Sequence, residues 1–229
     1  MEREELLTSI TDFIQDYKYG VVQQGMPAYV NRWIRQFADA DQLTVLKEMN
    51  NLIARLYLPR EEVKQFLKNF LLNSRICSAE PREKLRKMNF LRMEQKSRNQ
   101  AEMLKLADEI LQEEISLRVD QCGGSNDFMY LDDCIFRGNR FRQDLVTWIN
   151  NTAFKPGATI ITYHVARHKK GYEDATLHIK KAAYAKRVTV IFCYSKEIAP
   201  EEETAGHKPA KPATEAQQLG IFEDNGRFA

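Results

Sequence analysis

The chain has 229 residues, of which 29% are charged and 43% are hydrophobic, and its formal net charge is +2. This length is enough to bury one full core or two small ones, and so small a net charge gives no indication of nucleic-acid binding by itself. No apolar run reaches the roughly 20 residues that a membrane span requires, and the acidic start at residues 1–5 is unlike a signal peptide. We therefore expect a cytoplasmic protein that makes no membrane contact.

Residues 1–80 are predicted to form a helical domain. Apolar residues recur at helical spacing in four segments, which begin near residue 3, at Pro27, at Asp39 or Asp41, and at Pro59. Proline favours the first turn of a helix and aspartate favours the N-cap, so these residues mark helix starts. Such apolar stripes usually form a core, and we expect a small helical bundle; a groove for a partner or ligand is the alternative.

Residues 86–196 are predicted to form an α/β domain, after a polar connector over residues 74–87. Strands alternate with helices in this region, which indicates βαβ units and hence a mainly parallel sheet with flanking helices. Residues 197–229 are polar and are expected to be a flexible tail. The expected strands lie at about 88–94, 127–132, 158–165 and 187–194, and the clearest helices at 101–115 and 172–185.

An acidic pair, Asp132 and Asp133, follows the second expected strand, and Gly138 comes next at the start of a helix. Unpaired backbone N–H groups at a helix start hold phosphate well. Carboxylates accept hydrogen bonds from sugar hydroxyls or face a bound metal ion. The sequence therefore predicts a ribose-phosphate site in the loop between this strand and the helix.

This segment resembles the loop with which type I phosphoribosyltransferases bind phosphoribosyl pyrophosphate. In that family an acidic pair contacts the ribose hydroxyls, and a Thr-Gly-x-Thr turn surrounds the 5′-phosphate. By resemblance, Asp132 and Asp133 are the catalytic-site carboxylates. Arginines stand where the family usually has threonines; arginine is a good phosphate ligand, so phosphate binding is implied while transferase activity is left open. The phosphate-binding residues implied in this way are Arg137, Gly138, Asn139 and Arg140.

The pyrophosphate-binding loop of these enzymes follows the preceding strand, where this chain has a polar helix entry. Hydroxyl, amide and cationic donors there neutralise charge on a leaving pyrophosphate, although the same residue types also serve simply as helix caps. Magnesium would be held through the pyrophosphate, with no direct protein ligand implied. His164, near the end of the third strand, has either a direct or a structural role. The pyrophosphate-loop candidates are Lys96, Ser97, Arg98 and Asn99.

Residues 32–37, with the sequence Arg-Trp-Ile-Arg-Gln-Phe, sharpen the resemblance. They resemble the Arg-Trp-x-x-Gln-Phe helix of a phosphoribosyltransferase-like family of effectors in bacterial conflict and anti-phage systems, some of which occur beside retron reverse transcriptases. The likeness extends over residues 25–195. It implies a defence effector, or toxin, that acts on a nucleotide once it is released from a protein or ribonucleoprotein partner, such as a retron reverse transcriptase with its DNA and RNA.

Three functions stay open from the sequence. The first is a glycosyltransferase-class enzyme that displaces pyrophosphate at the ribose anomeric carbon, and the second is a non-catalytic module that binds a nucleotide or nucleic acid and holds a partner. The third is a structural α/β domain. Residues 130–133 also resemble the Tyr-x-Asp-Asp segment of reverse transcriptases, but the upstream strand lacks the aspartate that a polymerase metal site needs, and a helix follows instead of a hairpin.

Overall fold

The computed structural model describes residues 2–17, 26–77, 80–93, 98–198 and 220–223. The chain divides into two compact units, residues 1–63 and 64–229, and the division falls inside one helix, α4 (Arg60–Leu71). The expected domain boundary near residue 80 therefore lies inside the second unit. Among the described residues, no helix is both long enough and apolar enough to cross a membrane.

The first unit is the predicted helical bundle. It contains α1 (Glu2–Phe13), α2 (Met26–Ile34) and α3 (Asp39–Leu56), and the start of α4 follows. Apolar residues at helical spacing bury Ile10, Ile34 and Leu46 almost completely in a shared core. The Asp16 carboxylate accepts hydrogen bonds from the Tyr57 hydroxyl and from the first backbone N–H of α4, and so satisfies a donor that the helix leaves unpaired.

The second unit contains a five-stranded sheet in the order β1-β2-β3-β4-β5. The first four strands are parallel, as predicted, and β5 joins the edge of β4 in the antiparallel direction. Residues 220–223 thus add a strand within the segment that was expected to be a flexible tail. The strands are β1 (Asn89–Phe90), β2 (Asp127–Ile135), β3 (Thr159–His168), β4 (Thr189–Ile198) and β5 (Gly220–Glu223).

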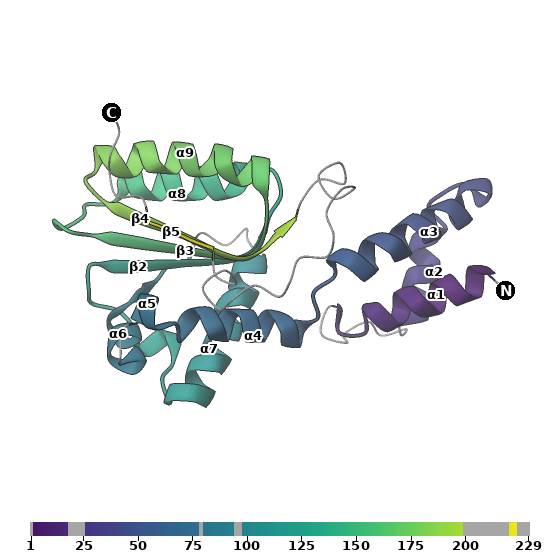
Figure 1. The fold of residues 1–229 in the computed structure, drawn as a ribbon, viewed down its shortest axis with the longest axis horizontal. Coiled ribbons are helices and arrows are strands. Elements are labelled where there is room, and N and C mark those ends of the chain that lie inside the picture. The colour runs from purple at the N-terminus through teal and green to yellow at the C-terminus, as the bar shows by residue number, and fades with distance from the viewer. Residues whose placement is uncertain (1, 18–25, 78–79, 94–97, 199–219, 224–229) are drawn as a thin grey trace. The chain divides into compact units, whose positions relative to one another are not determined.

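Helices cover both faces of this sheet (Figure 1). On one face lie α8 (Asn139–Asn151) and α9 (Lys169–Ala185); on the other lie α5 (Ser74–Cys77), α6 (Pro81–Lys87) and α7 (Arg98–Ile115). The segment expected to be a polar connector is therefore largely helical. It folds because Pro81 favours the first turn of α6 and Leu85 is fully buried. A short 3-10 helix, η2 (Val119–Gln121), precedes β2.

Side chains alternate between the two faces of each strand, so the sheet contributes to two cores. Tyr130 and Ile160 pack with Leu145 and Ile179 of α8 and α9. On the opposite face, the ring of Tyr163 stacks on Phe70 of α4 with 4.2 Å between the ring centroids. Because of this alternation, each strand side chain of the candidate site packs either against α8 and α9 or against the helices on the opposite face of the sheet.

Candidate functional site

The acidic pair lies within β2 and not in the loop after it, which corrects the expectation that the strand ends near residue 132. β2 stays paired with β3 as far as Ile135, and Asp132 stands opposite His164 in the register. Adjacent residues of a strand point to opposite faces of the sheet. Asp132 consequently faces the layer of α8, whereas Asp133 faces the layer of α7.

Asp132 is buried, with 2% of its surface exposed, and both of its oxygens have hydrogen-bond partners. Oδ2 accepts a hydrogen bond from Arg140 Nη2 at 2.9 Å and one from the Tyr130 hydroxyl at 3.1 Å. Oδ1 accepts from the Asp133 backbone N–H at 3.0 Å. Burial, reinforced by the negative charge of Asp132, raises the pKa of Tyr130 above its ordinary value, so this hydroxyl stays a donor. Asp132 is thus held in an ion pair beneath the loop.

Asp133 is half-buried and its partners are different. Its Oδ2 accepts a hydrogen bond from the Asn99 side-chain amide at 2.9 Å, and its Oδ1 accepts from the Cys134 backbone N–H at 2.7 Å. Burial and the nearby charge of Asp132 raise the pKa of the Asp133 carboxyl. Asn99, in the first turn of α7, therefore lies next to the acidic pair, where a residue of the expected pyrophosphate loop would lie. Of the other pyrophosphate-loop candidates, Lys96 and Ser97 lie outside the described residues, as does the side chain of Arg98.

The loop turns at Gly138, whose φ of 73° is favourable for glycine and strained for other residues. Gly138 is the N-cap of α8, and no described side chain caps this helix. The first turn, residues 139–142, contains two arginines and no acidic residue. Arg137 and Asn139 are exposed on either side of Gly138. Unpaired N–H groups and the helix dipole make this end of α8 electropositive, and Arg137 lies beside it, whereas Arg140 and Arg142 are paired with Asp132 and Asp174.

The same loop is pressed against the start of α9. A Cβ atom added to Gly138 would overlap the carbonyl oxygen of Gly171 and would lie 2.8 Å from the Cβ of Ala175. A Cβ added to Gly171 would overlap the carbonyl oxygen of Phe136. Two glycines therefore allow the two backbones to meet directly, and this contact fixes the position of the loop.

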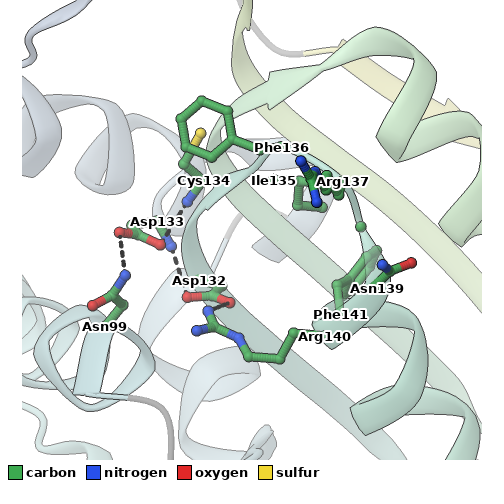
Figure 2. A pocket seen from close by; sticks show the side chains of 11 residues that line it. Asn99, Asp132, Asp133, Cys134, Ile135, Phe136, Arg137, Asn139, Arg140 and Phe141 are labelled. Carbon is green, nitrogen blue, oxygen red and sulfur yellow. Dashed lines mark hydrogen bonds and ion pairs between the residues drawn. The ribbon is translucent and has the colours of Figure 1, made fainter.

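Asn99 and residues 132–141 line a pocket of about 420 Å³ (Figure 2). Its volume falls in the range typical of small-molecule sites. The pocket lies at the C-terminal end of β2, and the carboxyl ends of parallel strands are where open α/β sheets usually bind ligands. In this pocket the structure brings together the acidic pair, the four residues predicted to bind phosphate, and Asn99.

His164 does not line the pocket. Its imidazole is fully buried, with the Phe141 ring 4.4 Å away between centroids, and neither ring nitrogen has a hydrogen-bond partner among the described residues. Burial lowers the pKa of His164 to about 4, so the imidazole is neutral at physiological pH. It lies behind the acidic pair in an aromatic environment that also includes Tyr130 and Tyr172.

Sequence reasoning gave no specific role in this region to Tyr130, Phe136 or Gly171. Tyr130 could have been found, because residues two apart in a strand share a face and a buried carboxylate needs donors. Phe136 follows the acidic pair closely, but its exposure depends on the course of the loop. The contact of Gly171 with Phe136 has no signal in the sequence, because it depends on how α9 approaches the loop.

A comparison with protein families matches residues 30–219 to the family PRTase-CE. The comparison with curated proteins gave no match, and that with solved structures gave none either. The matched residues include the whole pocket, all four parallel strands and most of α2. This match confirms the resemblance to phosphoribosyltransferase-like effectors, and it covers most of the chain. The protein therefore belongs to the PRTase-CE family.

Proposed function

We propose that this protein binds a ribose-phosphate compound, phosphoribosyl pyrophosphate or a nucleotide, in the pocket formed by Asn99 and residues 132–141. One observation carries the proposal: a half-buried carboxylate, Asp133, shares a pocket with the uncapped, arginine-bearing N-terminus of α8. Asp133 would accept hydrogen bonds from ribose hydroxyls, and Asn99 would donate to the ligand. The α8 N-terminus and Arg137 would hold the phosphate.

If the protein is a transferase, an acceptor displaces pyrophosphate from the ribose anomeric carbon. Asp133 then orients the ribose, and the arginines fix its phosphate, so that catalysis rests on orientation and charge neutralisation. Lys96, Ser97 and Arg98 would contact the pyrophosphate together with Asn99. Magnesium would be held through the pyrophosphate oxygens, because it prefers oxygen ligands and commonly binds substrate phosphates. When bound, it would neutralise charge on the leaving group.

The biological role that we propose is that of an anti-phage defence effector that acts on nucleotides in the cytoplasm. Membership of a phosphoribosyltransferase-like effector family supports this role. The partner would be a protein or ribonucleoprotein of a defence system, such as a retron reverse transcriptase with its DNA and RNA. Co-expression with and without such a partner, followed by measurement of cellular nucleotide pools, tests the role: unchanged pools in both cultures would refute it.

Titration calorimetry with phosphoribosyl pyrophosphate and magnesium tests the site itself. We expect saturable binding, and Asp133→Asn should weaken it about 10- to 150-fold because a charged hydrogen-bond acceptor is lost. Asp120→Asn is the matched control, since Asp120 is 63% exposed on η2 and outside the pocket. Absence of binding by the folded wild-type protein would refute the proposal for the isolated chain, and equal effects of the two substitutions would refute the placement of the site.

A non-catalytic binding module is the second candidate. It is favoured by Asp132, whose carboxylate is already occupied by Arg140 and Tyr130 and has only 2% of its surface exposed. One member of the acidic pair would then hold the loop in place without contacting the ribose. Saturable binding of phosphoribosyl pyrophosphate without pyrophosphate release, over a panel of nucleobase acceptors, favours this candidate. Binding to nucleic acid would instead depend on Arg137 and on salt concentration.

A further inference from the structure

Phe136 is a largely exposed aromatic residue among the residues that line the pocket. Its side chain is 62% exposed, whereas Ile135 and Phe141, which line the same pocket, are each 3% exposed. Among the described pocket residues it is the one large hydrophobic side chain left exposed. A ligand that covers this ring would remove its apolar surface from water, which is favourable.

The backbone of Phe136 is fixed even though its ring is not covered. Its carbonyl oxygen lies against Gly171 at the start of α9, so closely that any side chain at position 171 would overlap it. The preceding residue, Ile135, is still paired with β3. The ring is therefore presented by a rigid backbone, and it projects away from the ion pair of Asp132 with Arg140 (Figure 2). A preorganised aromatic side chain is a low-entropy platform for stacking.

The remaining exposed groups of the pocket are polar or charged, and they suit the sugar and the phosphate. Phe136 lies three residues after Asp133 and two residues before Gly138. The residues proposed to hold the ribose and the phosphate thus flank it in the same pocket. Neither a sugar hydroxyl nor a phosphate is a suitable partner for an exposed phenyl ring. A planar heteroaromatic ring is a suitable partner, because every nucleobase has a π-face that stacks on aromatic side chains.

We propose that Phe136 stacks on the nucleobase of a bound nucleotide. This inference rests on the proposed ribose-phosphate site, and it specifies that the ligand is a nucleoside phosphate and not a sugar phosphate alone. Stacking is tolerant of base identity, so the phenyl ring contributes affinity with little discrimination between bases. Phe136 is therefore assigned as a binding residue that distinguishes ligands with a base from those without one.

Calorimetry with two probes separates this inference from the proposal on which it rests. The probes are adenosine 5′-monophosphate and ribose 5-phosphate, and the variants are Phe136→Ala and Phe136→Tyr. The alanine variant should bind the nucleotide about 5- to 150-fold more weakly and ribose 5-phosphate with unchanged affinity, while the tyrosine variant keeps both affinities. Tyr184→Ala is the matched control, because Tyr184 is a 71% exposed aromatic residue of α9 outside the pocket.

Each alternative outcome has a definite meaning. If wild-type protein binds neither these probes nor phosphoribosyl pyrophosphate, the ribose-phosphate site is wrong and the stacking inference fails with it; if it binds phosphoribosyl pyrophosphate but not the nucleotide, only the stacking inference is refuted. If ribose 5-phosphate binds but Phe136→Ala leaves nucleotide affinity unchanged, or weakens both probes equally, only the stacking inference is refuted. Circular dichroism of each variant checks that the fold is retained.

Phe136→Trp provides a direct readout of the same contact. A base stacked on the indole should quench the added fluorescence, and ribose 5-phosphate should leave it unchanged. Wild-type protein supplies the background from its two native tryptophans, Trp33 and Trp148. Equal responses to the two probes would contradict the inference, since only one of them carries a ring that can stack.

Discussion

Replacing Gly138 with alanine should destabilise the α/β unit through two separate effects. The first is the backbone conformation, because a φ of 73° costs an L-residue about 1–2 kcal/mol. The second is steric: the new methyl group would overlap the Gly171 carbonyl oxygen and would lie 2.8 Å from the Ala175 Cβ. Overpacking of this kind typically costs a further 1–3 kcal/mol. We therefore expect Gly138→Ala to lower the free energy of unfolding by about 2–5 kcal/mol.

Gly157→Ala separates the two effects. Gly157 has a similar φ of 79°, but a Cβ there would have no heavy atom within 4 Å. Its substitution should therefore cost only the conformational term of about 1–2 kcal/mol. The excess loss in Gly138→Ala measures the contact between the loop and α9. Gly171→Ala disturbs the same contact from the α9 side, so it should also lower the free energy of unfolding by more than Gly157→Ala does.

Urea unfolding followed by the fluorescence of Trp148 measures these differences in unfolding free energy for the α/β unit, residues 64–229. Trp148 packs against Phe128 and Phe154 in the α/β unit, and the chain's other tryptophan, Trp33, belongs to the helical unit. A Trp33→Phe background therefore confines the signal to the unit that contains the site. Equal losses in Gly138→Ala and Gly157→Ala would refute the close contact of the loop with α9.

Three further predictions concern groups around the acidic pair. Burial lowers the pKa of His164 to about 4, so between pH 4 and 6.5 the unfolded chain binds more protons than the folded protein. The free energy of unfolding should therefore fall by about 3 kcal/mol as the pH falls through this window. Urea unfolding at several pH values measures this fall, and His164→Asn should remove the part of it that comes from His164. Arg140→Met should cost about 1–3 kcal/mol in chemical unfolding because it removes a charged partner of the buried Asp132 carboxylate, whereas Arg142→Met, whose partner Asp174 is exposed, should cost under about 1 kcal/mol; equal costs would show that the burial of Asp132 does not strengthen its ion pair. Burial raises the pKa of Cys134 to about 12, so at pH 8 iodoacetamide should modify it about 10³-fold more slowly than a free thiol, and labelling at the free-thiol rate, followed by peptide mass spectrometry, would contradict this.

Periodicity predicted the elements of this protein better than it predicted their ends. Most of the helices and the four parallel strands follow from apolar spacing, proline positions and the alternation of strand with helix, whereas α5 and α6 form in the segment that was expected to be a polar connector. The end of β2 was placed too early because aspartates are unfavourable in strands and usually mark their ends. Pairing with β3 continues to Ile135 in spite of this, and only the sheet as a whole decides that.

The composition of the site was more predictable than its geometry. The acidic pair, the turn glycine and Asn99 were identified from their order along the chain, and the structure brings them into one pocket. The partner of each carboxylate was not predicted, because it depends on which face of β2 the side chain occupies. The burial of His164 likewise depends on helices that arrive from elsewhere in the sequence.

Asp132 and Asp133 are neighbours in the chain, yet they depend on different parts of the molecule. The surroundings of Asp132 come from α8 and from Tyr130, whereas those of Asp133 come from the start of α7. A change at Asn99 therefore alters the carboxylate that faces the pocket while leaving the ion pair under the loop intact. A change at Arg140 removes a partner of Asp132 and leaves the hydrogen bond between Asn99 and Asp133 in place. The two carboxylates are thus anchored by separate contacts, which single substitutions can alter one at a time.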